Sequence, residues 1–231
     1  MKRFYNDVSV AEVDGGWQVM LDQRRMKTQI GSPQVVPTRA LAELLAAEWT
    51  RQGEEIDPKD FFFRDLADYA IDVVGQDRDA AVAALLAYIE TDTLCYRADP
   101  EEALYARQQQ LWEPLVAACE AREGVKLARV CGIVHKPQVE ATLAVLRERL
   151  SALDDFTLAA LQPITSLAAS LVVGLAALDP AADPAALFAA GNAEEDWQAE
   201  LWGWDYDAEE TRKTRERAFT LATDFLKAIR G

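Results

Sequence analysis

The sequence predicts an α+β protein in which a small N-terminal β-rich module precedes a larger helical module. Alternating apolar residues and turn signals fill roughly the first thirty positions, whereas apolar spacings of three and four residues dominate the remainder. The chain of 231 residues also has too few glycines (11) and prolines (9) for a large all-β protein. We place the boundary near Gly75, which gives predicted domains of 1–75 (β-rich, with one or two helices) and 76–231 (an orthogonal, bundle-like set of helices).

The first module is expected to begin with an antiparallel meander. Apolar and polar residues alternate over 4–10, and Asp14-Gly15-Gly16 is a tight-turn signal because glycine readily adopts positive φ angles. A second strand is expected over 17–21. A weaker turn at 22–25 would then lead into a third strand over 26–30.

Helical signals follow from residue 38 to the C-terminus. Thr38 is placed to cap a helix that Gly53 stops, and Asp99-Pro100 resembles the start of another helix. Pro114 should kink or end that helix, because proline lacks the backbone N–H. The stretch 125–134 could be a strand or a linker. Two pairs have the spacing of capping boxes, namely Asn192 with Glu195 and Asp207 with Glu210.

Composition excludes several classes of function. The 39 acidic residues outnumber the 24 basic ones, so the formal charge is −15, which disfavours binding to nucleic acid or to anionic membranes. The longest apolar run, Leu167 to Leu178, is too short to cross a bilayer and is expected to be a buried core helix. Three scattered cysteines do not form a disulfide framework, which indicates a reducing compartment.

The sequence lacks the common catalytic and cofactor motifs. It has no GxxxxGK[ST] or GxGxxG loop and no CxxC, so we expect no cofactor and no metal. The one histidine, His135, is more simply explained as a residue that caps or packs at a helix start. The carboxylates of 154–155 and 194–196 fall at predicted helix N-termini, where the dipole favours them, although spacing alone leaves a glycosidase-type pair open. Asp92, Arg97 and Arg107 could form a buried ion-pair network.

The most informative segment is 194–210, which contains eight acidic residues and no lysine or arginine. Four aromatic residues are interleaved with these acids: Trp197, Trp202, Trp204 and Tyr206. Tryptophan and tyrosine are enriched at interface hot spots, so the segment could grip a partner that has apolar and basic surface. Alternatively, these aromatic residues could fill the helical core around a turn at Gly203. The sequence favours neither interpretation.

An ordered set of motifs is similar to the family of chaperones that assemble the α subunit into the catalytic head of F-type ATP synthase. The motifs are KRFY (2–5), VMLDQRRMKT (19–28), AAEWTRQ (46–52), LADYAID (66–72), YIETDTLCYR (88–97), RQQQLWEPL (107–115), Gly132-Ile133 and EEDWQAELWGWD (194–205). The chain departs from the family pattern at Gln23, where glycine is usual, and at Gln29, where proline is usual. These departures affect the expected details of one turn in the β-rich module.

The resemblance implies a chaperone that is not an enzyme. It would cover the subunit interface of the free α subunit against aggregation and release it to the β subunit without ATP hydrolysis. The resemblance further implies a functional acid near the Trp-Gly motif, either Glu200 or Asp205. Trp202 would be an anchor and Gly203 the turn that aims it. We expect a monomer in the bacterial cytoplasm, since KRFY at the start leaves no room for a presequence, or in the mitochondrial matrix if the chain is processed.

Two other functions remain open at this level. An acidic-residue hydrolase would use a cleft between the two domains, with His135 as the best remaining candidate base. A scaffold protein without client turnover has the same composition as a chaperone. Addition of the β subunit would distinguish a scaffold from a chaperone, because a chaperone would release its bound partner.

Overall fold

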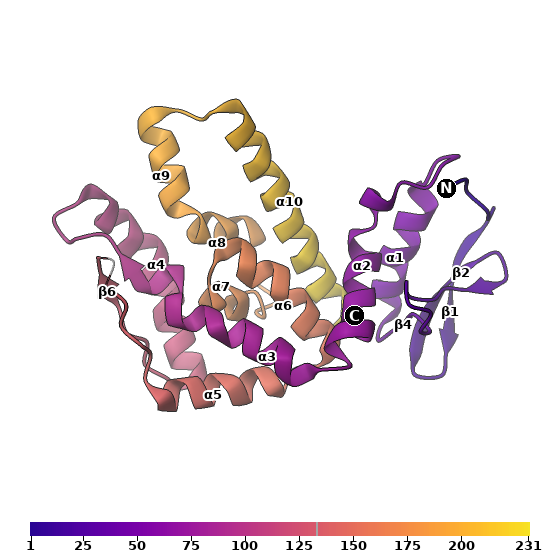
Figure 1. Ribbon diagram of the computed structural model, residues 1–231, viewed down its shortest axis with the longest axis horizontal. Helices are drawn as coiled ribbons and strands as arrows, with labels where there is room; N and C mark the ends of the chain where they lie inside the picture. Colours follow the sequence, from indigo (N-terminus) through magenta and orange to yellow (C-terminus); the bar gives the residue numbers. More distant parts are fainter. Residues whose placement is uncertain (133) are drawn as a thin grey trace. The chain divides into compact units, whose positions relative to one another are not determined.

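The computed structural model describes residues 1–132 and 134–231, so Ile133 of the Gly132-Ile133 motif lies outside the described residues. The fold is α+β, with a short-stranded sheet near the N-terminus and helices through most of the rest, which confirms the predicted fold class (Figure 1). The chain divides into two compact units. The first contains 1–78, 154–160 and 221–231, and the second contains 79–153 and 161–220.

The first unit is built on an antiparallel sheet with one helix packed on it. Strands β1 (Val8–Val13) and β2 (Gly16–Leu21) pair so that Val10 faces Val19. Short strands β3 (Arg24–Arg25) and β4 (Val35–Val36) both pair with β2. Helix α1 (Arg39–Arg51) packs on β1 and β2, and its buried apolar residues form part of the core of this unit.

Short helical segments follow α1 along the chain. A short 3-10 turn, η1 (Pro58–Asp60), precedes α2 (Phe62–Tyr69), and the chain continues as a π-helical turn, η2 (Ala70–Val74). Thr38 caps α1 as predicted, because its hydroxyl accepts a hydrogen bond from the N–H of Leu41 at 3.1 Å.

The prediction of a third strand over 26–30 was wrong. Asp22 takes a positive φ of 53°, so the turn is completed at 22–23 and the strand begins at once with Arg24. Residues 28–31 instead form a second turn, in which the N–H of Gly31 binds the carbonyl oxygen of Thr28 at 3.0 Å. The second half of the predicted weak turn, Arg24-Arg25, is therefore the strand, and residues 28–30 of the predicted strand belong to the second turn.

Among its described residues, the second unit consists of helices and loops together with one two-stranded parallel ladder between β5 (Tyr96–Arg97) and β6 (Val130–Cys131). Its core includes the fully buried side chains of Trp112, Leu146, Phe188 and Phe219. Its helical elements are α3 (Arg78–Ala87), η3 (Tyr88–Thr91), η4 (Thr93–Cys95), α4 (Ala103–Glu123), α5 (Glu140–Ser151), most of α6 (Asp155–Ala168), α7 (Leu171–Ala176), α8 (Pro184–Gly191), α9 (Ala193–Trp202) and most of α10 (Tyr206–Ala228).

Three helix predictions were wrong at least in part. Helix α4 begins at Ala103, after the predicted start at Asp99-Pro100, and continues through Pro114 to Glu123. The proline therefore does not end the helix, and the alternative of a kink stays a prediction. The apolar run 167–178 is largely buried but is not one helix, because Ala169 has a positive φ of 46° and Ser170 caps a new helix, α7. His135 is exposed and lies five residues before α5, where its Nδ1 is 2.9 Å from the hydroxyl of Tyr96, so it does not cap a helix.

Neither predicted capping box is formed. The side chain of Asn192 makes no capping bond to α9, because its amide donates to the carbonyl oxygen of Phe188 and its oxygen accepts from Arg215. The α10 cap lies two residues earlier than predicted, at Asp205.

The compact units are not the continuous segments 1–75 and 76–231, since parts of α6 and α10 group with the N-terminal residues. The limit at 75/76 therefore stays a prediction about folding domains. Along the described chain, every helix is too short or too polar to pass through a bilayer.

Candidate functional site

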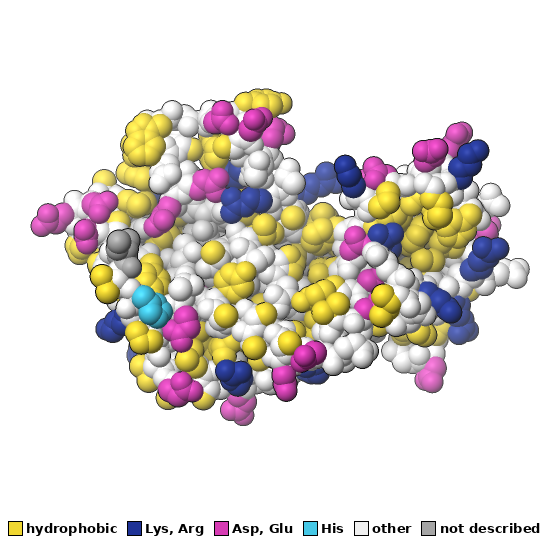
Figure 2. All heavy atoms as spheres, viewed as in Figure 1, with side chains coloured by type: hydrophobic (Ala, Val, Ile, Leu, Met, Phe, Trp, Pro, Cys, Tyr) yellow, Lys and Arg dark blue, Asp and Glu magenta, His cyan; other side chains and the backbone are white. Residues whose placement is uncertain are grey.

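The acidic and aromatic segment forms an exposed tip where α9 ends and α10 begins. The two helices run in opposite directions and are joined by a short turn (Figure 1). Trp202 is 79% exposed and Tyr206 is 75% exposed, and Leu201 is also largely exposed. Hydrophobic and acidic side chains gather at this end of the helices in Figure 2. The interpretation in which these aromatic residues fill the core is therefore wrong for Trp202 and Tyr206.

Gly203 produces the turn between the two helices. It has φ of 83° and ψ of 160°, a backbone conformation that is essentially restricted to glycine. Asp205 then caps α10, because its carboxylate accepts hydrogen bonds from the N–H groups of Asp207 (3.2 Å) and Ala208 (3.4 Å). The predicted turn at Gly203 is confirmed, and Asp205 has a clear local role in starting the next helix.

Glu200 is held by an arginine that lies far away in the sequence. The guanidinium of Arg107, on α4, forms a bidentate ion pair with the Glu200 carboxylate at 2.5 and 2.7 Å. The same guanidinium lies 5.6 Å from the ring centre of Trp197. The hydrogen bonds from Arg107 lower the pKa of Glu200 below its usual value and keep the carboxylate charged. Glu200 therefore joins the exposed end of α9 to α4.

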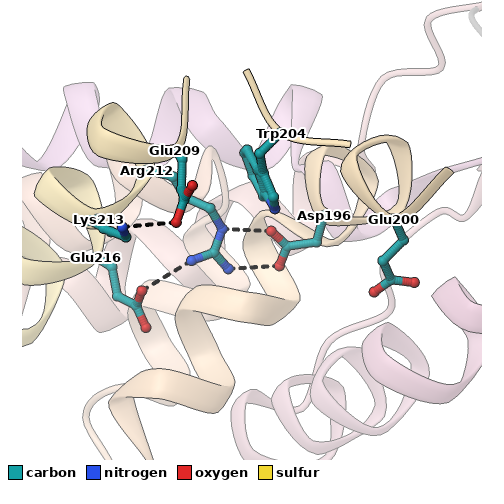
Figure 3. Close-up of a pocket in the computed structure, with 7 residues that line it drawn as sticks. All are labelled: Asp196, Glu200, Trp204, Glu209, Arg212, Lys213 and Glu216. Atoms are coloured by element: carbon teal, nitrogen blue, oxygen red, sulfur yellow. Dashed lines mark hydrogen bonds and ion pairs between the residues drawn. The ribbon is translucent and has the colours of Figure 1, made fainter. Parts of the chain in front are cut away.

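Arg212 is the centre of the contacts between α9 and α10 (Figure 3). It donates two hydrogen bonds to the Asp196 carboxylate, at 2.6 and 2.7 Å, and one to Glu216 at 3.0 Å. Its guanidinium lies 5.8 Å from the ring centre of Trp204. These contacts fix the spacing of the two helices that carry the tip.

A cavity of about 320 Å³ lies between α9 and α10 and is lined by charged residues and one tryptophan. Figure 3 labels its lining residues, which are Asp196, Glu200, Trp204, Glu209, Arg212, Lys213 and Glu216. Each acid pairs with a base: Asp196 and Glu216 with Arg212, Glu209 with Lys213, and Glu200 with Arg107. The pair of Asp196 with Arg212 joins α9 to α10, and two of the other pairs lie within α10. Carboxylates paired in this way leave few groups available for proton transfer.

The predicted network of Asp92, Arg97 and Arg107 is wrong, because the three side chains have different partners. Arg107 pairs with Glu200, whereas Arg97 lies 2.8 Å from Glu113. Asp92 is fully buried and accepts N–H hydrogen bonds from Leu94 and Val172, each at 3.0 Å. Asp92 thus joins the start of η4 to the start of α7.

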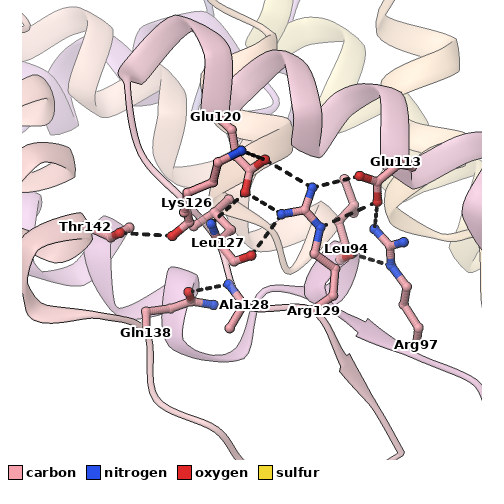
Figure 4. A network of polar contacts seen from close by, with 10 residues as sticks. All are labelled: Leu94, Arg97, Glu113, Glu120, Lys126, Leu127, Ala128, Arg129, Gln138 and Thr142. Atoms are coloured by element: carbon pink, nitrogen blue, oxygen red, sulfur yellow. Dashed lines mark hydrogen bonds and ion pairs between the residues drawn. The ribbon is translucent and has the colours of Figure 1, made fainter.

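A different ion network is centred on Arg129, which the sequence did not single out (Figure 4). Arg129 binds Glu113 at 2.8 Å and also binds Glu120, which in turn accepts the N–H of Leu127 at 2.7 Å. The hydrogen bond from Arg129 lowers the pKa of Glu113. For Glu120, burial opposes ionisation, but the bonds from Arg129 and Leu127 outweigh it and lower the pKa. This network fastens the segment after α4 to that helix.

All four predicted partner-binding residues lie at the tip, but their roles differ. These residues are Glu200, Trp202, Gly203 and Asp205. Trp202 alone presents a large exposed apolar side chain, while Glu200 and Asp205 are engaged in contacts within the chain. Arg107 was not predicted as part of this site. No local signal reveals it, because it is separated from Glu200 by 93 residues.

Comparisons with known proteins agree with this architecture. Residues 2–120 match the model of a family described as ATP12 chaperone protein. The protein atp12, mitochondrial, of Schizosaccharomyces pombe is 27% identical over 221 residues, which cover 90% of this chain and 76% of that protein.

Two solved structures extend the likeness to the whole chain. The crystal structure of Atp12 from Paracoccus denitrificans is 35% identical, with a TM-score of 0.93 over 99% of this chain and 98% of that one. An aspartate-to-lysine mutant of Atp12p from P. denitrificans gives the same identity and TM-score over 99% of this chain and 97% of that one. The family match covers more than half of the 231 residues, and the chain therefore belongs to the ATP12 chaperone protein family, a family of ATP synthase assembly chaperones.

Proposed function

We propose that this protein binds the unassembled α subunit of F-type ATP synthase, covers its subunit interface and releases it to the β subunit. The observation that carries this proposal is the tip between α9 and α10, where Trp202 and Tyr206 are largely exposed beside acidic residues. An exposed aromatic anchor in acidic surroundings suits a partner surface that is apolar with basic neighbours. The net charge of −15 on the whole chain would speed the encounter with a basic client.

The tip has a rigid frame, which supports binding rather than a passive surface role. Arg212 joins α9 to α10, and Arg107 joins α9 to α4, so Trp202 projects from helices fixed on both sides. A fixed anchor loses less conformational entropy on binding than a mobile one. We propose Trp202 as the anchor, Gly203 as the turn that aims it, and Glu200 or Asp205 as the functional acid.

The proposal includes a mechanism of release that requires no catalysis. The final α–β interface would displace the chaperone because it is the more stable of two competing interfaces, so ATP hydrolysis is unnecessary. We further propose that the protein is not an enzyme and acts as a monomer, in the bacterial cytoplasm or, for a processed eukaryotic chain, the mitochondrial matrix.

The test is rescue of an isolated client. Purified protein at equal molar ratio is expected to keep the ATP synthase α subunit soluble during dilution from denaturant, and to leave it when the β subunit is added. Trp202→Ala is expected to weaken this rescue, whereas Ile30→Ala, which shortens an equally exposed apolar residue elsewhere, leaves it unchanged. Aggregation of the α subunit despite the chaperone would rule out the proposed client.

A further inference from the structure

A second surface of the helical unit has the properties of a binding groove. It lies between α4 and the segment from α7 to α8 and has a volume of about 400 Å³. Leu111, Pro114 and Ala118 line it from α4, and Asp183, Ala186 and Leu187 line it from α8. It shares no lining residue with the cavity behind the tip.

The groove has the length and shape of a helix-binding site. Its α4 wall extends from Gln110 to Arg122, which corresponds to about 18 Å along the helix axis, or about three turns. The opposite wall is largely another helix, α8, whose lining side chains recur at helical spacing. A cleft between two helices accommodates a third helix, whose side-chain ridges enter the groove.

Pro114 adds a polar feature to this apolar surface. Proline has no backbone N–H, so the carbonyl oxygen of Gln110 lacks the partner that residue 114 of a regular helix would supply. Both residues line the groove. A ligand with a hydrogen-bond donor can therefore satisfy an acceptor that α4 leaves without its usual helical bond.

The charge at the rim is negative. Asp179 and Asp183 each accept one backbone N–H, from Ala181 (2.9 Å) and Ala185 (3.0 Å), and neither pairs with a basic side chain within the described part of the chain. Arg122, also on the rim, pairs with Glu123 at 2.9 Å, and Glu123 also pairs with Arg149 at 3.3 Å, so the two aspartates outnumber one partly compensated arginine. The rim thus favours a basic partner and, with a charge of −15 on every copy, disfavours a second copy of this chain.

We propose that this groove binds an amphipathic helix of the client, about three turns long. Its apolar face contacts Leu111 and Leu187, and a flanking lysine or arginine reaches Asp179 or Asp183. The identity of the client rests on the proposed function above, whereas the groove and the class of its ligand rest on the geometry and charge just described.

Two pairs of neighbouring alanines allow a matched test. Ala118→Phe and Ala186→Trp fill the groove from opposite walls, while Ala117→Phe and Ala185→Trp place the same side chains on adjacent exposed positions that do not line it. All four are surface changes, and circular dichroism verifies folding. The probe is a fluorescein-labelled synthetic peptide of about twelve residues, with leucine on one helical face and lysine on the other. Its binding is measured by fluorescence anisotropy, and rescue of the ATP synthase α subunit is measured in parallel.

Filling the groove is expected to weaken peptide binding at least about tenfold and to reduce rescue, with the two controls within about twofold of the native protein. Equal peptide binding by all four variants, or no peptide binding by the native protein, overturns the groove proposal. The proposed function is then decided separately, by whether the native protein rescues the α subunit. Groove-dependent peptide binding without any α-subunit rescue supports the groove and rejects the proposed client. A native dimer, seen by light scattering and lost on filling the groove, overturns the proposal in favour of self-association.

Discussion

Glu200 illustrates how one residue can serve either a partner or the fold. Its carboxylate is exposed yet paired with Arg107, so loss of function in Glu200→Lys would not by itself identify a client contact. The like-charged variant would repel Arg107 and free the end of α9. The two roles are therefore inseparable in single variants.

A charge swap separates these roles. We expect Glu200→Lys and Arg107→Glu each to weaken rescue of the α subunit, with unchanged helix content by circular dichroism. The double variant Arg107→Glu with Glu200→Arg restores the ion pair with its polarity reversed. If Glu200 only positions α9, the double variant recovers most of the rescue. If the acid meets the client directly, rescue stays low, and Asp205→Lys should then be compared with it.

The backbone conformation of Gly203 makes glycine necessary at the turn between α9 and α10. Gly203→Ala is expected to destabilise the native state by about 1–3 kcal/mol, because alanine strongly disfavours a φ of 83° with a ψ of 160°. No atom lies within 4 Å of the added Cβ, so the cost comes from the backbone and not from a steric clash. Gly53→Ala is the control, since Gly53 has equal space and no positive φ. Thermal unfolding that shifts equally in both variants would contradict this explanation.

Among the elements, local capping signals were predictable where nothing else competed for the side chain. Thr38 begins α1 as expected, because its hydroxyl is available to the N–H of Leu41. Asn192 has equally good spacing, but Arg215 and Phe188 occupy its side chain. Capping patterns report local chemistry, whereas tertiary contacts decide whether the capping atom is free.

Pro114 shows the same limit in a helix interior. Sequence rules predict a kink or an end, but α4 is 21 residues long and continues beyond the proline. Trp112 is fully buried beside it, and its indole N–H donates to the carbonyl oxygen of Ala190 at 2.7 Å. Packing around Trp112 keeps the helix in place where the backbone alone would break.

This explanation predicts that Pro114→Ala stabilises the protein. Alanine restores the N–H for the Gln110 carbonyl oxygen and removes the proline ring, with a gain of up to about 3 kcal/mol. The measurement is chemical unfolding followed by circular dichroism. Ala117→Gly, at an exposed position one turn further along α4, should instead cost about 1 kcal/mol. A lower stability for Pro114→Ala would mean that the packing around α4 requires the proline at this position.

For the molecule as a whole, the order of elements was predictable but the compact units were not. The sequence indicates where strands give way to helices, because the apolar period changes from two to about 3.6. It does not reveal that 154–160 and 221–231 group with the N-terminal residues. The Thr38 hydroxyl, for example, donates a hydrogen bond to the carbonyl oxygen of Ala228 at 2.5 Å. No local sequence pattern links two residues so far apart in the chain.

Global stability should also depend on pH through Asp92. Burial raises the pKa of this carboxyl from 3.8 to about 6, despite the hydrogen bonds from Val172 and Leu94 that oppose the change. The folded state binds this proton more tightly than the unfolded state. The contribution of Asp92 to the free energy of unfolding is therefore fully present below about pH 4 and is lost as pH rises through about 6. At about 1.4 kcal/mol per pKa unit, the loss is at most about 3 kcal/mol.

Asp92→Asn isolates this contribution from the rest of the titration. Glu113 and Glu120 have lowered pKa values and act in the opposite direction, so they remove stability on acidification in both proteins alike. The variant is expected to be less stable at every pH, because the asparagine oxygen can still accept one backbone N–H but its NH2 group faces the other donor without accepting from it. Its deficit relative to the native protein should grow from pH 7 to pH 4, as measured by urea unfolding at each pH. A deficit that is constant across this range would show that Asp92 keeps an ordinary pKa in the folded protein.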